Sequence, residues 1–467
     1  MTSPPGESRD PTPERLAGAI DRADRLWNGA ALFVESRLVW SRVYRTASYL
    51  KSALWTVPFI SILCVLAIAP ALRVLDGWLG WRISGLGRGG ATSLYQTVIT
   101  LTLSFIVFTF GSLLVAIQVA GAQLTPRVIA TTLLRDNVVR YTVGLFVFAL
   151  VFAIMALNRV ETTINEIVPL LCAALGLISI AAFLFLIDYA ARLLRPVSIL
   201  AHVGDKGLTV IETVYPERVS DTADVDGASD DLPTGTSTEI LHDGRSEIVL
   251  AVDLAPLVRQ ARQADGVIEC LFQVGDFVAS GEPLFVLYGG AERIELPALR
   301  AAVAFGPERT MEQDPLFSFR ILVDIALKAL SPAINDPTTG VLALDQIHRL
   351  LRLVGKRQLR KDTIRDDRGR PRVILHTPNW EDFVNVACVE IPSYGAANVQ
   401  IARRLRAMIE NCIESLPRHR HAALLMQRDR LDRMIESLYP IPDDLALARV
   451  PDTQGLGGSS RRKLVNR

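Results

Sequence analysis

The sequence predicts a membrane protein with an α-helical four-span transmembrane bundle, followed by a cytoplasmic α+β domain with a small β module and a helical end. Of the 467 residues, 50% are apolar and 21% are charged, and the mean hydropathy is +0.28. Four long apolar runs occur in the first half of the chain, each of roughly the 20 residues needed to cross a bilayer. Soluble helices normally keep one polar face, so such runs favour membrane spans over buried helices. The predicted spans are residues 52–72, 94–119, 138–157 and 167–187.

The distribution of cations predicts the orientation of these spans. Lys and Arg are frequent before the first run, between the second and third runs, and after the fourth. The short loop between the third and fourth runs carries only Arg159, beside Glu161 and Glu166. Because cytoplasmic loops carry an excess of Lys and Arg, we expect both termini in the cytoplasm and a multi-pass protein of the cell (inner) membrane.

Changes in composition predict the other boundaries. Apolar residues recur at spacings of three and four in residues 14–48, which indicates an amphipathic juxtamembrane helix. That helix lies in the headgroup layer of the membrane or packs on the cytoplasmic domain. Acidic and small residues at 217–233 indicate a mobile loop. The predicted parts are a disordered N-terminus (1–13), the juxtamembrane helix (14–48), the transmembrane domain (49–195), a connector with the acidic loop (196–246), the β module (247–300), the helical cytoplasmic domain (301–440) and a disordered tail (441–467).

Short strands and turns are predicted between residues 247 and 289. Gly-Asp and Gly-Glu turn signals at 275–276 and 281–282 give an arrangement similar to the half-barrels of biotinyl and lipoyl carriers. A carrier needs a lysine at its hairpin tip, and no Lys lies between Lys206 and Lys328. The pattern therefore predicts a structural β module and excludes a carrier.

Helical periodicity begins near residue 311. Asp314-Pro315 and Asp336-Pro337 each combine an aspartate N-cap with a proline in the first turn, which predicts two helix starts. Later helices are predicted at about 380–391, 396–416 and 420–438, and a strand at 372–376.

Two stretches carry a family resemblance. The first is residues 118–127 (Gln-Val-Ala-Gly-Ala-Gln-Leu-Thr-Pro-Arg) followed by Leu-Arg-Asp at 134–136. The second is residues 324–339, which include Ser-Pro-Ala-Ile-Asn-Asp-Pro-Thr-Thr, with Asp314 just ahead of it. Together they resemble a bacterial family of predicted membrane proteins named domain of unknown function 2254. The resemblance covers roughly residues 50 to 440, and it implies location and architecture without implying an activity.

The second predicted span is the most polar, and it supplies the first candidate site. Hydroxyl, amide and small residues recur there at spacings of three, four or seven, so they share one side of a helix. They line either a close helix-packing surface or a pore or solute path, and packing is favoured because no charge lies mid-span. Asp188, just past the fourth span, is a weaker candidate for an ion-path carboxylate. The strip consists of Thr97, Thr100, Ser104, Gly111, Gln118, Gln123 and Arg127.

The second candidate site lies between the two predicted Asp-Pro helices. Oxygen ligands and free helix-start N–H groups could hold an ion there. A tight corner between two helices, capped by Asp336, accounts for the same residues and is the favoured interpretation. Arg320, Asp324 and Lys328 lie four apart and predict a salt-bridged helix face. The candidate residues are Asp324, Ser331, Asn335, Asp336, Thr338 and Thr339.

Several classes of function are disfavoured. The net charge of +1 offers no field for nucleic acid. A Gly-x-Gly-x-x-Gly match at 85–90 lacks the preceding strand of a dinucleotide site, and the Cys and His residues form no metal or nucleophile motif. We therefore expect no enzymatic activity and no cofactor, with the lipid bilayer and further copies of the chain as partners. Two functions stay open: an oligomeric channel or transporter-like protein with a cytoplasmic regulatory domain, and a non-transporting scaffold or sensor that binds an unknown protein or ion.

Overall fold

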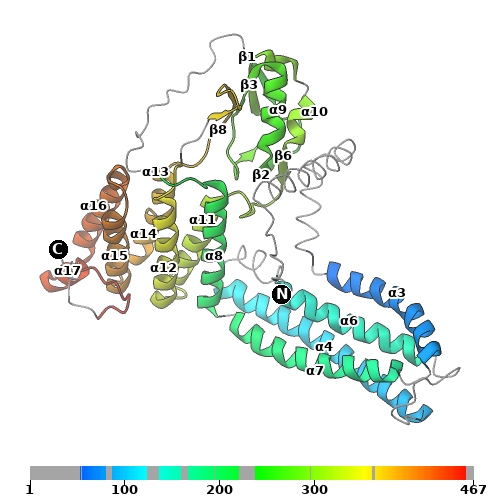
Figure 1. Ribbon diagram of the computed structural model, residues 1–467. Coiled ribbons are helices and arrows are strands. Elements are labelled where there is room, and N and C mark those ends of the chain that lie inside the picture. The colour runs from blue at the N-terminus through cyan, green and yellow to red at the C-terminus, as the bar shows by residue number, and fades with distance from the viewer. Residues whose placement is uncertain are drawn as a thin grey trace, which may run out of the picture.

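Long apolar helices and a mixed α+β region make up the two parts of the computed structural model (Figure 1). The structure describes residues 53, 55–79, 87–123, 136–158, 167–193, 195–219, 237–294, 296–359 and 363–458. The predicted segments 1–13 and 14–48 and the acidic part of the connector at 220–236 lie outside these residues.

Within the described residues, the apolar part has four helices: α3 (Thr56–Leu79), α4 (Arg88–Gln123), α6 (Asn137–Leu157) and α7 (Ile167–Leu193). Among the described residues, α4, α6 and α7 are long and apolar enough to cross a membrane, and α3 has a shorter apolar part. The predicted runs at 94–119, 138–157 and 167–187 are therefore confirmed as apolar helices. The run at 52–72 gives a helix that continues to Leu79, because the polar residues after the run do not stop a helix.

Helix α6 is the centre of the bundle, with α3 on one side and α4 and α7 on the other. Gly144 of α6 allows α3 to approach closely, since a Cβ there would lie 2.6 Å from Val57 Cγ1. Between α4, α6 and α7 the space is filled by aromatic rings. Phe105 and Phe183 stack at 4.2 Å between centroids, and Phe105 and Phe146 lie 5.6 Å apart. The interior of the bundle is thus an apolar core.

Polar contacts join the helices at the end of the bundle that adjoins the α+β region. Asp136 caps α6 through the backbone N–H of Val138 at 2.8 Å, and it accepts a hydrogen bond from the Tyr189 hydroxyl of α7 at 2.5 Å. Arg140, in the first turn of α6, donates to the Thr56 hydroxyl at 2.6 Å. The starts of α3 and α6 and the end of α7 therefore lie together.

Helix α8 (Pro196–Val214) follows α7 and leads into the helical part of the α+β region. Its buried face packs on α11 and α12, and Gly207 lets it approach closely, because a Cβ there would lie 3.0 Å from Ser318 Cβ. The helical core also contains the later helices. They are α11 (Pro315–Ala329), α12 (Pro337–Val354), α13 (Trp380–Cys388), α14 (Ile391–Gly395), α15 (Val399–Ser415), η3 (Arg418–Arg420), α16 (His421–Leu438) and α17 (Pro442–Ala448).

The two predicted Asp-Pro helix starts are confirmed. Asp314 accepts from the backbone N–H of Phe317 at 2.9 Å and caps α11. Asp336 accepts from that of Thr339 at 3.1 Å and caps α12. In both helices the proline occupies the first turn, where its missing N–H costs no hydrogen bond.

The β module contains two sheets with the strand orders β1-β5-β3-β8-β7 and β4-β2-β6. The sheets extend beyond the predicted limits of 247–300, because four strands (β1, β6, β7 and β8) come from outside them and β3 pairs with β8 in parallel. A partner about 100 residues away leaves no signal in the local pattern. The elements are β1 (Ser237–Leu241), β2 (Glu247–Val252), α9 (Leu254–Ala264), β3 (Gly266–Cys270), β4 (Phe277–Val278), β5 (Pro283–Gly289), η2 (Gly290–Arg293), α10 (Leu296–Ala301), β6 (Val303–Gly306), β7 (Thr363–Arg365) and β8 (Pro371–Leu375).

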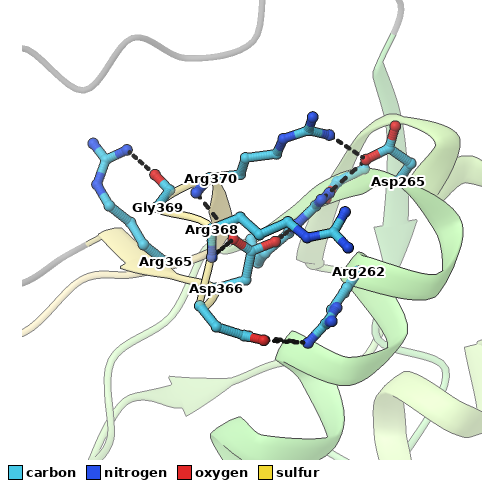
Figure 2. A network of polar contacts seen from close by, with 10 residues as sticks. Arg262, Asp265, Arg365, Asp366, Arg368, Gly369 and Arg370 are labelled. Carbon is cyan, nitrogen blue, oxygen red and sulfur yellow. Dashed lines mark hydrogen bonds and ion pairs between the residues drawn. The ribbon is translucent and has the colours of Figure 1, made fainter.

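The β7–β8 turn is held to the module by a buried ion pair (Figure 2). Asp366 accepts from the backbone N–H groups of Arg368 and Arg370 and from Arg372 Nε, at 2.9, 3.0 and 2.9 Å. The Arg372 guanidinium holds the pKa of Asp366 well below its usual range, at about 2. Arg372 also donates to Asp265 at 3.0 Å, at the start of β3. These contacts therefore fix the distant hairpin in the sheet.

The C-terminal tail is ordered further than the composition predicts. Disorder is predicted from residue 441, whereas α17 covers Pro442–Ala448 and the structure describes residues up to 458. Fully buried Arg403 donates to the carbonyl oxygens of Val450 at 3.0 Å and Gly457 at 2.6 Å. A contact made by an arginine on α15 therefore orders a segment whose own sequence resembles a flexible tail.

Candidate functional site

The polar strip of α4 faces away from the other apolar helices. Its five described members are all exposed in the single chain: Thr97, Thr100, Ser104, Gly111 and Gln118. A Cβ on Gly111 would meet nothing within 4 Å. The opposite face is buried against α6 and α7. The side chains of Gln123 and Arg127 lie outside the described part of the chain. The strip is thus available to lipid or to another protein chain.

The hydroxyl groups of the strip bond to their own helix. Thr97, Thr100 and Ser104 donate to the backbone carbonyls four residues earlier, at 2.8, 2.9 and 2.7 Å. This back-bonding satisfies the hydroxyl protons without a partner helix. Each oxygen keeps acceptor capacity on the exposed side. The strip can therefore face lipid at little cost, and it can also offer acceptors to a cation or to water.

The C-terminal end of α4 packs into the helical core of the α+β region. Ala116 is buried in that core, with Leu113 and Ile117 packed against it. Lys328, in the last turn of α11, donates its Nζ to the carbonyl oxygen of Gly121 at 3.0 Å. A lysine near the last carbonyls of a helix interacts favourably with the helix dipole. This contact joins α4, the helix that carries the polar strip, directly to α11.

The predicted charged face of α11 divides in two. Arg320 pairs with Asp324 through Nε at 2.6 Å and also with Glu390, which raises the pKa of the guanidinium. Lys328 lies on the same face but contacts α4 instead of Asp324. The spacing of four residues predicts the Arg320–Asp324 pair, whereas nothing in it indicates the contact of Lys328 with a helix some 200 residues earlier.

The corner between α11 and α12 uses most of its polar groups internally. Ser331 donates its hydroxyl to the Lys328 carbonyl at 2.7 Å, and its own carbonyl accepts from Asn335 N–H at 2.8 Å. Asn335 has a positive φ of 49°, a conformation that asparagine tolerates in turns. The Asp336 carboxylate accepts from the Thr339 hydroxyl at 2.6 Å as well as from its N–H. Thr338 is exposed, and Asp324 pairs with Arg320 outside the corner. This arrangement favours a structural corner over an ion site.

We expect Asp336→Ala to lower the stability of the α+β region by about 1–2 kcal/mol, because it removes the N-cap of α12. Thermal melting of the full chain in detergent measures the loss. Asp336→Asn is the matched control, since asparagine caps almost as well. An alanine variant that melts as the unmodified chain does, but loses a bound ion, would contradict the structural interpretation.

Two other carboxylates near the bundle end differ in role. Asp188 forms an ion pair with Arg192 one turn later, so its charge is compensated on α7. Asp136, which belongs to the first family motif, joins α6 to α7 through Tyr189. A hydropathy pattern treats Asp136 as an ordinary loop residue, and the motif was the only signal for it.

Comparisons with known proteins agree with this architecture. A family model described as "Predicted membrane protein (DUF2254)" matches residues 51–411 and so includes both motifs. The uncharacterized proteins Rv1290c of Mycobacterium tuberculosis and Mb1321c of Mycobacterium bovis are each 27% identical over 389 residues, covering 78% of this chain and 73% of theirs. No solved structure matches the chain. Because the family model covers most of the chain in one continuous match, this protein belongs to the DUF2254 family of predicted membrane proteins.

Proposed function

We propose that this protein is a four-span protein of the cell (inner) membrane that assembles into a symmetric homo-oligomer and forms a channel or transporter-like path along α4. The α+β region is the cytoplasmic regulatory domain, and the chain has no enzymatic role. The observation that carries the proposal is the outward position of the polar strip on α4, whose end is built into the core of the α+β region. The path would lie between copies, because phenylalanine rings fill the interior of the single bundle.

The fourth span in this proposal is α3. Its 24 residues correspond to about 36 Å of helix, which is enough to cross the hydrocarbon core. The cation distribution supports cytoplasmic termini. We expect a cysteine at position 163 to react with an impermeant reagent in intact cells, and one at position 131 to stay unlabelled. Labelling at 131 would contradict the orientation.

Disulfide trapping in native membranes tests the assembly, in a background without the five native cysteines. Four single Thr→Cys variants form a matched set on α4. Positions 97 and 100 are exposed, whereas positions 102 and 109 are buried against α6 and α7. We expect crosslinked dimers from the first two and none from the second two. Equal crosslinking from all four variants, or monomers from all four, would contradict an oligomer in which α4 faces the symmetry axis.

Flux measurement in liposomes separates the channel from its alternative. We expect potassium flux from the full chain, changed by crosslinking at position 100. The alternative is a scaffold or sensor that binds a partner through the cytoplasmic domain. The back-bonded hydroxyls favour it, because they leave the strip without a need for a polar partner in the membrane. Crosslinked oligomers that carry no flux would support the scaffold.

A further inference from the structure

A cavity of about 410 Å³ lies between the β module and the helical core of the α+β region. Its walls come from the residues after α8, the start of α11, the β2–α9 junction, and the β7–β8 segment with the residues that follow it. This volume lies within the range of small-molecule sites, which prefer the junction between two packed units. The cavity is predominantly apolar, with Leu254, Val274 and Leu375 among its lining residues.

The charged residues of this lining are acidic apart from one histidine. Among the described residues, Glu217 and Asp314 contribute carboxylates to the lining, and neither a Lys nor an Arg contributes. His376 lies 3.6 Å from Glu269. Asp314 is only 3% exposed, and its burial raises the pKa of the carboxyl to about 6. A carboxylate held in an apolar wall at a cost to its own solvation is typical of a functional site.

Asp314 is also fixed in position. One oxygen accepts from Phe317 N–H at 2.9 Å, so the carboxyl is held by the first turn of α11. The other oxygen lies beside Gly275, where a Cβ would come within 2.4 Å of it. Arg309, whose guanidinium carbon would lie 3.7 Å from the same Cβ, lowers the pKa of Asp314, and Asp276 raises it. Among the described residues that line the cavity, His376 is the only basic side chain.

We propose that this cavity binds a small organic cation, an amine or related ammonium with an apolar body, whose charge pairs with Asp314. The apolar wall would bury the body of the ligand. The ammonium would replace part of the solvation that the carboxylate loses by burial. A neutral molecule would bring no counter-charge to the acidic lining, and an anion would add a like charge beside Glu217 and Asp314.

The position of the cavity also indicates how a bound ligand would act on α4, and this step rests on the proposed function. Asp314 begins α11, and Lys328 in the last turn of the same helix contacts the end of α4. The 15 residues of α11 therefore form one rigid element of about 22 Å between the cavity and the polar helix. A ligand that moves the start of α11 would shift the contact at Gly121.

Binding of 2-phenylethylammonium to the purified full chain in detergent tests the site, with saturation-transfer NMR as the readout. 2-Phenylethanol and phenylacetate are the neutral and anionic probes. We expect saturable binding of the cation alone, weakened at least tenfold in Asp314→Asn, in which asparagine keeps the cap of α11. Asp336→Asn makes the same change at the start of α12, away from the cavity, and should bind as the unmodified chain does. Leu254→Trp, which fills the cavity, should also bind weakly.

Equal binding of the cation to Asp314→Asn and to the unmodified chain would overturn the proposal, as would binding of the alcohol or phenylacetate with similar affinity. Absence of saturable binding by the cation would also overturn it. Binding is measured without reference to transport, so its failure is distinct from the failure of the proposed function. Binding without any potassium flux would leave the cation site standing and remove the channel. Potassium flux without binding would leave the channel standing and remove the cation site.

Discussion

Replacing Arg403 with alanine is expected to lower the stability of the helical core of the α+β region by about 3–4 kcal/mol. The side chain is fully buried and donates to the carbonyl oxygens of Val450 and Gly457. Without the Arg403 side chain, the two carbonyl oxygens lose this donor, and a cavity opens beside α15. Because these bonds hold the segment after α17, we also expect that segment to become accessible to protease. Thermal melting and limited proteolysis of the full chain in detergent measure the two effects.

Arg403→Lys is the matched control for this change. Lysine keeps the positive charge, but its single ammonium cannot reproduce the fork of donors that reaches both carbonyls. We expect an intermediate loss of stability. A chain ending at residue 440 should lose about as much stability as the alanine variant. If both the truncated chain and Arg403→Ala melt at the original temperature, the ordered tail contributes nothing to the fold.

Asp314→Asn is expected to stabilise the protein at neutral pH by up to about 3 kcal/mol. Burial raises the pKa of this carboxyl from 3.8 to about 6 in the folded chain. Between pH 4 and pH 6 the folded state therefore binds more protons than the unfolded state, and stability falls as pH rises. Asparagine keeps the cap on Phe317 and removes the buried charge. A gain of this size through loss of a native charge is typical of residues retained for function.

Melting curves of the full chain between pH 4 and pH 8 measure this effect. We expect the variant and the unmodified chain to melt together near pH 4 and to separate progressively up to about pH 6.5. The difference should then stay constant. A variant that is less stable at every pH would mean that the carboxylate makes contacts that asparagine cannot replace. A separation that grows toward acid would contradict the raised pKa.

The membrane location, the apolar helices and the helix caps could be predicted from the sequence because each depends on contiguous residues. The apolar runs at 94–119, 138–157 and 167–187 are visible as composition, and they form α4, α6 and α7. The Asp-Pro pairs at 314–315 and 336–337 cap helices through atoms no more than three residues away. The side of α4 that carries hydroxyl groups also follows from spacing alone.

Contacts between distant residues determine the rest. The spacing in α4 defines a polar side, but the packing of α6 and α7 on the opposite side turns it outward. Three contacts join residues about 50 to 200 positions apart. Lys328 contacts Gly121, β8 pairs with β3, and Arg403 holds the C-terminal tail. The cavity beside Asp314 exists only where several such segments meet. Local hydropathy and capping patterns report the preferences of neighbouring residues, whereas these features arise from packing that brings remote segments together.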